Sequence, residues 1–369
     1  MAVPALALGL LFGCVAPAGS ELAQSSTSPG AQAATPEAEP EDKPQPITVS
    51  AWQEALVSVT DLDRTARFFL EIGSYETVWR GPVSAGDLSQ FGLPETASGE
   101  ALLLRAPGSV DGYIRLVRFD GAGPKQPTRP GARAWDTGCF WSIMVRMKDM
   151  QSAYDDAIAM GWWTETQIAP LSFNGSELNI VVFKGPDGVQ VQAYERLNRP
   201  TPEGYPPFAR MGQPFNIMQM TRDRDAARRL MVDVLGFDTF WFGPPQTSDG
   251  PTLMPLGIPQ NLTPSVPYKA GIFSPPTQAI SGRMEYIEID GLEGFDLADR
   301  CKVPNLGTLS VSYPVDNVEE AQARITDRGW PIERGPYTVD RPPYGTLTAF
   351  VIKAPDGAEI EFYESKTAE

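Results

Sequence analysis

The side chains best suited to chemistry in this sequence are carboxylates on segments that alternate between apolar and polar residues. Glu54, Glu285 and Glu361 each lie on such a segment, and this alternation is typical of a half-buried strand. A carboxylate that is removed from water holds its proton more strongly, and it can act alone as a general base on an acidic carbon. The sequence therefore makes these three glutamates the candidate catalytic residues.

Nitrogen and sulfur donors are scarce by comparison. The chain has no histidine and three cysteines, Cys14, Cys139 and Cys301, with no C-x-x-C pair among them. Iron(II) oxygenases need two imidazoles, and zinc nearly always takes nitrogen or sulfur ligands. We therefore expect no oxygen-activating iron site and no zinc site. We also expect Cys139 and Cys301 to be buried free thiols, with a disulfide between them as the alternative in an oxidising compartment.

The elements that must position the glutamates come from a repeated pattern. The stretch Leu178–Glu195, LNIVVFKGPDGVQVQAYE, has a second copy at Leu347–Glu364, LTAFVIKAPDGAEIEFYE. In both, alternating apolar residues flank a Pro-Asp-Gly turn, which predicts a hairpin of two strands. Two copies of the same hairpin indicate an internal duplication.

The pattern upstream of these hairpins repeats as well, and it predicts a strand followed by a capped helix. One helix opens at Thr60, with Asp63 three residues later. The whole chain then divides into four modules of order β-α-β-β-β, which makes the fold class α+β. The modules lie at about 50–121, 138–196, 214–291 and 306–365.

One such module leaves open sheet edges, so we expect modules to pair around a cleft. The expected domains are 48–200, from the first two modules, and 210–366, from the last two. Within the third module, the proline-rich stretch Gly243–Gly282 is a candidate lid over its cleft, with surface decoration as the alternative.

The N-terminal residues predict export. The apolar run Ala2–Phe12 is too short to span a bilayer, and Leu11-Phe12-Gly13-Cys14 resembles the bacterial lipobox, whose cysteine is lipidated. Residues 1–14 are thus a predicted signal peptide and residues 15–47 a disordered linker. We expect a bacterial envelope protein on the periplasmic side, anchored through Cys14. A plain signal peptide, or a cytoplasmic protein with a frayed tail, stays open because no Lys or Arg precedes Lys43.

Composition limits the partners. The net charge is −16, and binding to nucleic acid or to an anionic membrane surface needs clustered Lys and Arg. We expect contact with a membrane only through the lipid anchor, no contact with nucleic acid, and a monomer.

The module order, the Gly-Trp helix ends and the Pro-Asp-Gly hairpins together resemble the vicinal oxygen chelate superfamily, which includes glyoxalase I, extradiol dioxygenases, and fosfomycin and bleomycin resistance proteins. The resemblance covers essentially everything after residue 48. It implies modules paired around clefts and, in catalytic members, a divalent metal held by residues of the first and last strands of each paired module, usually His and Glu.

The positions of this sequence that match that pattern carry no histidine. The resemblance implies a first cleft with Glu54, Arg115, Ser142 and Gln192, and a second cleft with Asn216, Glu285, Ser310 and Glu361. The oxygen atoms of the second set suit Mg, Mn or Ca, whereas hydrogen-bonded polar residues in a wet cleft are the plainer interpretation.

Arg115 and two tryptophans suggest a different use of the clefts. A cleft-facing arginine receives carboxylate or phosphate groups, although Arg115 can instead pair with Glu54. Trp79 and Trp241 occupy equivalent strands and are candidate ligand-binding walls, with core packing as the alternative.

The leading hypothesis is an exported protein of the glyoxalase and bleomycin-resistance type that binds a small organic molecule without a transition metal or other cofactor. The alternative is a glyoxalase-like lyase or isomerase that uses Mg, Mn or Ca at Glu285 and Glu361, or a lone carboxylate base. A second alternative is a structural envelope protein with both clefts filled by side chains.

Overall fold

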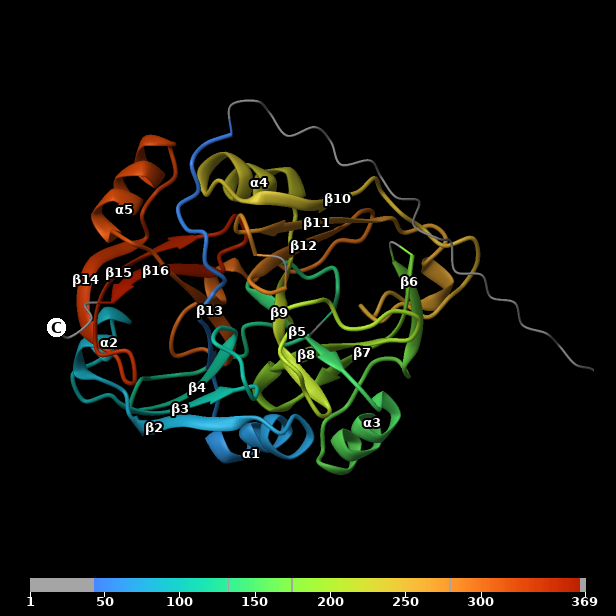
Figure 1. Ribbon diagram of the computed structural model, residues 1–369, viewed down its shortest axis with the longest axis horizontal. Helices are drawn as coiled ribbons and strands as arrows, with labels where there is room; N and C mark the ends of the chain where they lie inside the picture. Colours follow the sequence, from blue (N-terminus) through green and yellow to red (C-terminus); the bar gives the residue numbers. More distant parts are fainter. Residues whose placement is uncertain (1–42, 132, 174, 279, 366–369) are drawn as a thin grey trace, which may run out of the picture.

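The computed structural model describes residues 43–365 except 132, 174 and 279 (Figure 1). The predicted signal peptide, Cys14 and most of the predicted linker lie outside these residues. The described chain forms two curved eight-stranded sheets with a few short helices. None of the helices in this part of the chain is long and apolar enough to cross a membrane.

Sheet 1 has the strand order β14-β15-β16-β13-β1-β4-β3-β2. Its strands are β1 (Glu54–Ser58), β2 (Glu76–Pro82), β3 (Ser98–Arg105), β4 (Tyr113–Asp120), β13 (Gly307–Pro314), β14 (Arg334–Asp340), β15 (Thr346–Lys353) and β16 (Glu359–Ser365).

Sheet 2 has the order β10-β11-β12-β9-β5-β8-β7-β6. Its strands are β5 (Phe140–Met147), β6 (Ala169–Phe173), β7 (Ser176–Lys184), β8 (Gln190–Arg196), β9 (Met211–Met220), β10 (Asp238–Phe242), β11 (Tyr268–Ser274) and β12 (Arg283–Ile289).

The four β-α-β-β-β modules are confirmed, but the expected pairing of modules is wrong. The first module shares sheet 1 with the fourth, through antiparallel β1 and β13. The second shares sheet 2 with the third, through antiparallel β5 and β9. All four modules begin with a similar alternating strand, and any two such edges can satisfy each other's backbone groups. The pattern therefore predicts that modules pair without specifying which ones do.

The helices that follow the first strand of each module pack on the outer faces of the sheets, whereas the inserted helix α2 contributes Asp87 to the concave face of sheet 1. Figure 1 shows α1 and α3 on one side of the molecule and α4 and α5 on the other. In the first and third modules the α-helix continues into a short π-helical segment. The bounds are α1 (Leu62–Arg67, then Phe68–Ile72), α2 (Ala85–Gln90, an insertion after β2), α3 (Met150–Ala159), α4 (Arg224–Arg228, then Arg229–Val234) and α5 (Val318–Asp327).

One large apolar core joins all four modules and contains residues of both sheets and of the helices α1, α3, α4 and α5. Phe68, which follows α1, stacks on Trp162, which follows α3, with ring centroids 4.0 Å apart. Strand alternation decides what faces this core: Ala55 and Val57 of β1 lie in it, whereas Glu54 lies on the opposite, concave face. Successive side chains of a strand point to opposite faces, so the polar candidates are directed into the clefts.

The Pro-Asp-Gly hairpins link one module to the next. Asp187 accepts hydrogen bonds from the backbone N–H and the hydroxyl of Thr60, and Asp356 accepts one from the backbone N–H of Arg222. Thr60 is therefore not the helix cap that we expected. The side chain of Asp61 caps α1 instead.

The last residues of the predicted linker belong to the fold, so the predicted end of the linker at residue 47 is wrong. Ile47 is buried and donates its N–H to the carbonyl of Leu235 at 2.9 Å. Arg324 and Arg328 on the fourth-module helix donate to the carbonyl of Gln45. These hydrogen bonds satisfy backbone groups of residues 45–47, a segment for which composition alone predicts no structure.

Cys139 and Cys301 form a disulfide with a Cα–Cα distance of 5.2 Å, so the expectation of two free thiols is wrong. The cysteines are 162 residues apart, and their spacing carries no recognisable signal. Cys139 directly precedes β5 of sheet 2, and Cys301 lies shortly before β13 of sheet 1. The bond thus ties the two sheets together.

Replacing both cysteines by serine (Cys139→Ser with Cys301→Ser) should lower the free energy of unfolding by about 2–4 kcal/mol, because the bond closes a long loop and restricts the unfolded chain. Urea denaturation of the variant and of the wild type, the latter with and without reductant, measures this. Identical midpoints in all three samples would show that the bond does not form.

Candidate functional site

The predicted site residues fall into two clefts, but in a different distribution from the one expected. Cleft 1, on the concave face of sheet 1, holds Glu54, Arg115, Ser310 and Glu361. Cleft 2, on the concave face of sheet 2, holds Gln192, Asn216 and Glu285, and Ser142 is hydrogen-bonded to Gln192 there. The prediction had grouped the residues by the wrong module pairs, so this correction follows from the strand order.

Cleft 1 is filled by its own side chains and leaves a cavity of only about 30 Å³. The Nε atom of Arg115 donates to Glu54 at 2.7 Å, and the hydroxyl of Tyr344 donates to the same carboxylate. Arg115 therefore pairs with Glu54, which was one of the two alternatives predicted from the sequence.

Arg341 completes this filling from the loop between β14 and β15. It donates to Asp87 of the inserted helix α2 at 2.7 Å and to Glu361 of β16. Burial alone would lower the pKa of Arg341, but the facing carboxylates outweigh that effect and raise its pKa well above the ordinary value. The two glutamates of cleft 1 are thus held by guanidinium groups.

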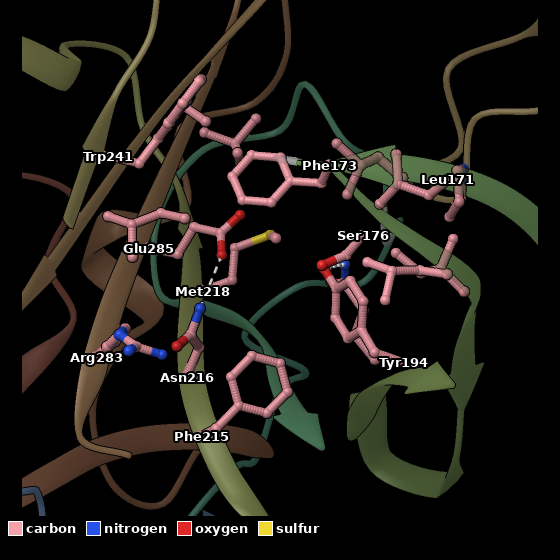
Figure 2. A pocket seen from close by; sticks show the side chains of 18 of the residues that line it. Leu171, Phe173, Ser176, Tyr194, Phe215, Asn216, Met218, Trp241, Arg283 and Glu285 are labelled. Atoms are coloured by element: carbon pink, nitrogen blue, oxygen red, sulfur yellow. Dashed lines mark hydrogen bonds between the residues drawn. The ribbon is translucent and has the colours of Figure 1, made fainter. Parts of the chain in front are cut away.

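Cleft 2 is open and contains a cavity of about 320 Å³. Its floor is formed by the central strands of sheet 2, where Met218 lies between Glu285 on one neighbour and Ser142 on the other. Figure 2 shows Glu285 and Asn216 on one side of the cavity, with Tyr194 across from them.

Aromatic and apolar side chains form the walls of cleft 2. Phe173 of β6 and Trp241 of β10 meet with ring centroids 5.2 Å apart. Met254, Pro255 and Leu256, from the long stretch after β10, also line the cavity. The stretch Gly243–Gly282 therefore covers part of cleft 2, which agrees with its prediction as a candidate lid. Trp79, the repeat counterpart of Trp241, lies in cleft 1 against Arg115.

Polar groups in cleft 2 form two short hydrogen-bonded sets. The amide of Asn216 donates to Glu285 at 3.1 Å, while its carbonyl oxygen Oδ1 is buried and has no hydrogen-bond partner among the described residues. On the facing module, Ser142 donates to Gln192, and Gln192 donates to the hydroxyl of Tyr194. A buried acceptor without a partner destabilises the folded protein unless a ligand or a water molecule donates a hydrogen bond to it.

Glu285 has a raised pKa. Burial raises its pKa to about 7, although the hydrogen bond from Asn216 and the charge of Arg283 act in the opposite direction. The group therefore exchanges its proton near neutral pH, which a general base requires.

Sequence reasoning missed the arginines of cleft 2, which are Arg146, Arg196, Arg199 and Arg283. Strand alternation could have found two of them. Arg146 has the same parity as Ser142 on β5, and Arg196 the same parity as Gln192 on β8. Both had to face the same cleft as those candidates.

Neither cleft offers the ligand set that zinc or iron takes. Cleft 2 supplies one carboxylate, three amides and three hydroxyl groups, and none of the residues that line it is a histidine or a cysteine. In cleft 1, guanidinium groups stand between the carboxylates and would repel a cation. Glu285 and Glu361 line different clefts, so the predicted Mg, Mn or Ca site that combines them cannot form. The described residues contain no cluster of three or more His, Cys, Asp or Glu placed to hold a metal ion.

Comparison with known proteins supports the fold. No protein-family model matches the sequence, and no curated protein matches it. Glyoxalase I from Zea mays is similar in structure, with a TM-score of 0.55 and 13% identity over 85% of this chain and 92% of that one. A putative dioxygenase from Bacillus subtilis has a TM-score of 0.51 and 11% identity over 88% of this chain and 87% of that one. The chain thus shares the overall fold of these two proteins, in keeping with the fold that the sequence predicted.

Proposed function

We propose that this protein binds a small organic molecule with an apolar ring or chain in cleft 2 and does so without a transition metal. The single observation that carries the proposal is the contrast between the clefts: about 320 Å³ of open space in cleft 2 against about 30 Å³ in cleft 1. A concave, mostly apolar cavity with a few convergent polar groups is the usual form of a small-molecule site. Phe173 and Trp241 provide the apolar walls, and Asn216, Glu285 and Tyr194 the polar groups.

The proposed location is the bacterial cell envelope, with the protein acting as a monomer. Disulfides persist in oxidising compartments such as the periplasm, so the bond between Cys139 and Cys301 is in keeping with export. The lipobox-like sequence at Cys14 supports a lipid anchor.

A purely structural role with both clefts filled was the second alternative. It expects side chains throughout both clefts, and the cavity in cleft 2 does not meet that expectation.

The repeat offers a matched pair of variants. Ala270 in cleft 2 pairs with Ile287, and Ala101 in cleft 1 pairs with the equivalent Val117. We expect Ala270→Phe to weaken binding of 1-naphthol by about tenfold or more, equivalent to about 1.4 kcal/mol, because the new ring occupies the cavity. Ala101→Phe should leave the affinity within about twofold of the wild type while lowering stability, because cleft 1 has no room for the ring.

Fluorescence titration of 1-naphthol against the wild type and both variants measures these affinities, and thermal melts report folding. Failure of the wild type to bind 1-naphthol and related aromatic compounds, or equal affinities in the wild type and Ala270→Phe, would contradict binding in cleft 2.

A second candidate function, a metal-free lyase or isomerase, is favoured by one observation, the pKa of about 7 for Glu285. In that case Glu285 takes a proton from an acidic carbon of the bound molecule and returns it at a neighbouring position. Glu285→Gln separates the candidates, since an enzyme loses turnover whereas a binder keeps most of its affinity. Glu54 and Glu361 are poor bases here, because Arg115 and Arg341 hold them in cleft 1.

A further inference from the structure

One end of cleft 2 carries a group of arginines from three neighbouring strands and the segment that follows them. Arg283 begins β12, Arg146 lies near the end of β5, and Arg196 ends β8, with Arg199 shortly after. Arg146 lies beside Tyr194 of the adjacent strand. All four line the same cavity as Glu285, and we call them the arginine group.

The surroundings of Arg146 differ from those of the arginines in cleft 1. Arg115 and Arg341 in cleft 1 face carboxylates directly. Arg146 instead lies over the rings of Phe215 and Tyr205, at 4.5 and 5.4 Å from their centroids.

Within the arginine group, two nitrogen atoms can donate hydrogen bonds to a ligand. The Nε atoms of Arg146 and Arg196 are buried and have no hydrogen-bond partner in the described part of the chain. Arg196 also donates from Nη2 to the hydroxyl of Ser176 at 3.2 Å, so its side chain is already directed along the cavity wall.

The arginines also repel one another. Burial lowers the pKa of Arg146, and the charge of Arg196 adds to that effect. Burial and the charge of Arg146 together lower the pKa of Arg283 to about 10, while the charge of Glu285 acts in the opposite direction. Burial also lowers the pKa of Arg196, and the charge of Arg199 adds to that effect. A group of like charges at a cavity raises the free energy of the empty site, and an anion that enters relieves it.

Resting on the proposed function, we propose that the ligand of cleft 2 is an anion with two negative charges, a phosphate monoester or a close analogue, attached to an apolar ring or chain. Its oxygens accept hydrogen bonds from Arg146 and Arg196 and are attracted by Arg283. Planar guanidinium groups suit such oxyanions because they present paired N–H donors. The apolar part lies toward Phe173 and Trp241. A dianion suits the site better than a monoanion, because several guanidinium groups share the cavity with one carboxylate.

The test compares 1-naphthyl phosphate with 1-naphthol at about pH 8, where the phosphate is a dianion because its second pKa is about 6. Isothermal titration should give an affinity at least about tenfold higher for the phosphate, since hydrogen bonds between charged groups are stronger than those between neutral ones. Arg146→Gln and Arg196→Gln should each weaken the phosphate about tenfold and leave 1-naphthol within about twofold. Arg118→Gln, on a half-exposed arginine of sheet 1 that pairs with Asp120, is the matched control and should change neither affinity.

Stability provides an independent readout. Arg146 has no acidic partner among the ion pairs of the described residues, so Arg146→Gln should leave the melting temperature unchanged or raise it, whereas loss of a purely structural arginine would lower it. Should Arg146→Gln fail to fold, the charge there is structural, and the proposal is overturned unless Arg196→Gln and Arg199→Gln still weaken the phosphate selectively.

The outcomes separate the two proposals. If 1-naphthol and its phosphate bind equally, and the arginine variants change neither, the dianion inference is wrong while binding in cleft 2 stands. If neither compound binds to the wild type, the proposed function itself fails.

Discussion

Replacing Arg341 by alanine is expected to lower the free energy of unfolding by about 3–5 kcal/mol, because removal of one partner leaves buried carboxylates without a counter-charge. Arg341 is the only cation that Asp87 contacts among the described ion pairs, and it also holds Glu361. The side chains of all three residues are less than a tenth exposed. Urea denaturation at about pH 7 measures the change.

Two comparisons make this result specific. Arg80→Ala breaks exposed pairs with Asp63 and Glu100 and should cost less than about 1 kcal/mol. Neutralising all three members of the buried set, as Arg341→Met with Asp87→Asn and Glu361→Gln, should recover much of the loss.

Ligand binding provides a second readout for Arg341→Ala. Because the proposed site is in cleft 2, the variant should keep the wild-type affinity for 1-naphthol under conditions where it is folded. A loss of affinity without a loss of stability would place the binding site in cleft 1 instead.

Glu285→Gln is expected to remove a pH dependence from the stability of the protein. The pKa of Glu285 is about 7 when folded, against an ordinary value of 4.5, so the folded state holds a proton that the unfolded state releases. The stabilisation is therefore complete below about pH 4.5 and is lost as pH rises through about 7. The resulting cost is about 3 kcal/mol above that range. The glutamine variant, which stays neutral, should be more stable than the wild type by up to about this amount at about pH 8 and similar to it at about pH 4.

Free energies of unfolding at these two pH values test the prediction, with Glu293→Gln, an exposed carboxylate, as the matched control. If the wild type and Glu285→Gln change in parallel with pH, Glu285 ionises normally, and the case for a carboxylate base in cleft 2 fails with it.

Much of the fold could be predicted from local patterns. Alternation along the strands and the Pro-Asp-Gly turns predicted all four modules, because each pattern reflects an interaction within one module. Parity then placed Asn216, Glu285 and Gln192 on cleft faces, where the structure has them. The pairing of modules depends on which distant edges meet, and four similar edges contain no information about that choice.

The same limit explains the errors at the site. Arg115 was a plausible ligand receptor until Glu54 and the loop after β14 were placed beside it. The disulfide joins residues 162 positions apart, which no local spacing predicts. The arginine group was missed because its members come from three different strands and form one site only after β5, β8 and β12 are aligned in sheet 2.

The most direct test of the central claim is a crystal structure of the protein with 1-naphthyl phosphate. We predict the naphthyl ring in cleft 2, beside Phe173 and Trp241, with the phosphate at Arg146 and Arg196 and with cleft 1 still filled by Arg341. Density for the compound in cleft 1, or iron or zinc bound at Glu285, would contradict the account.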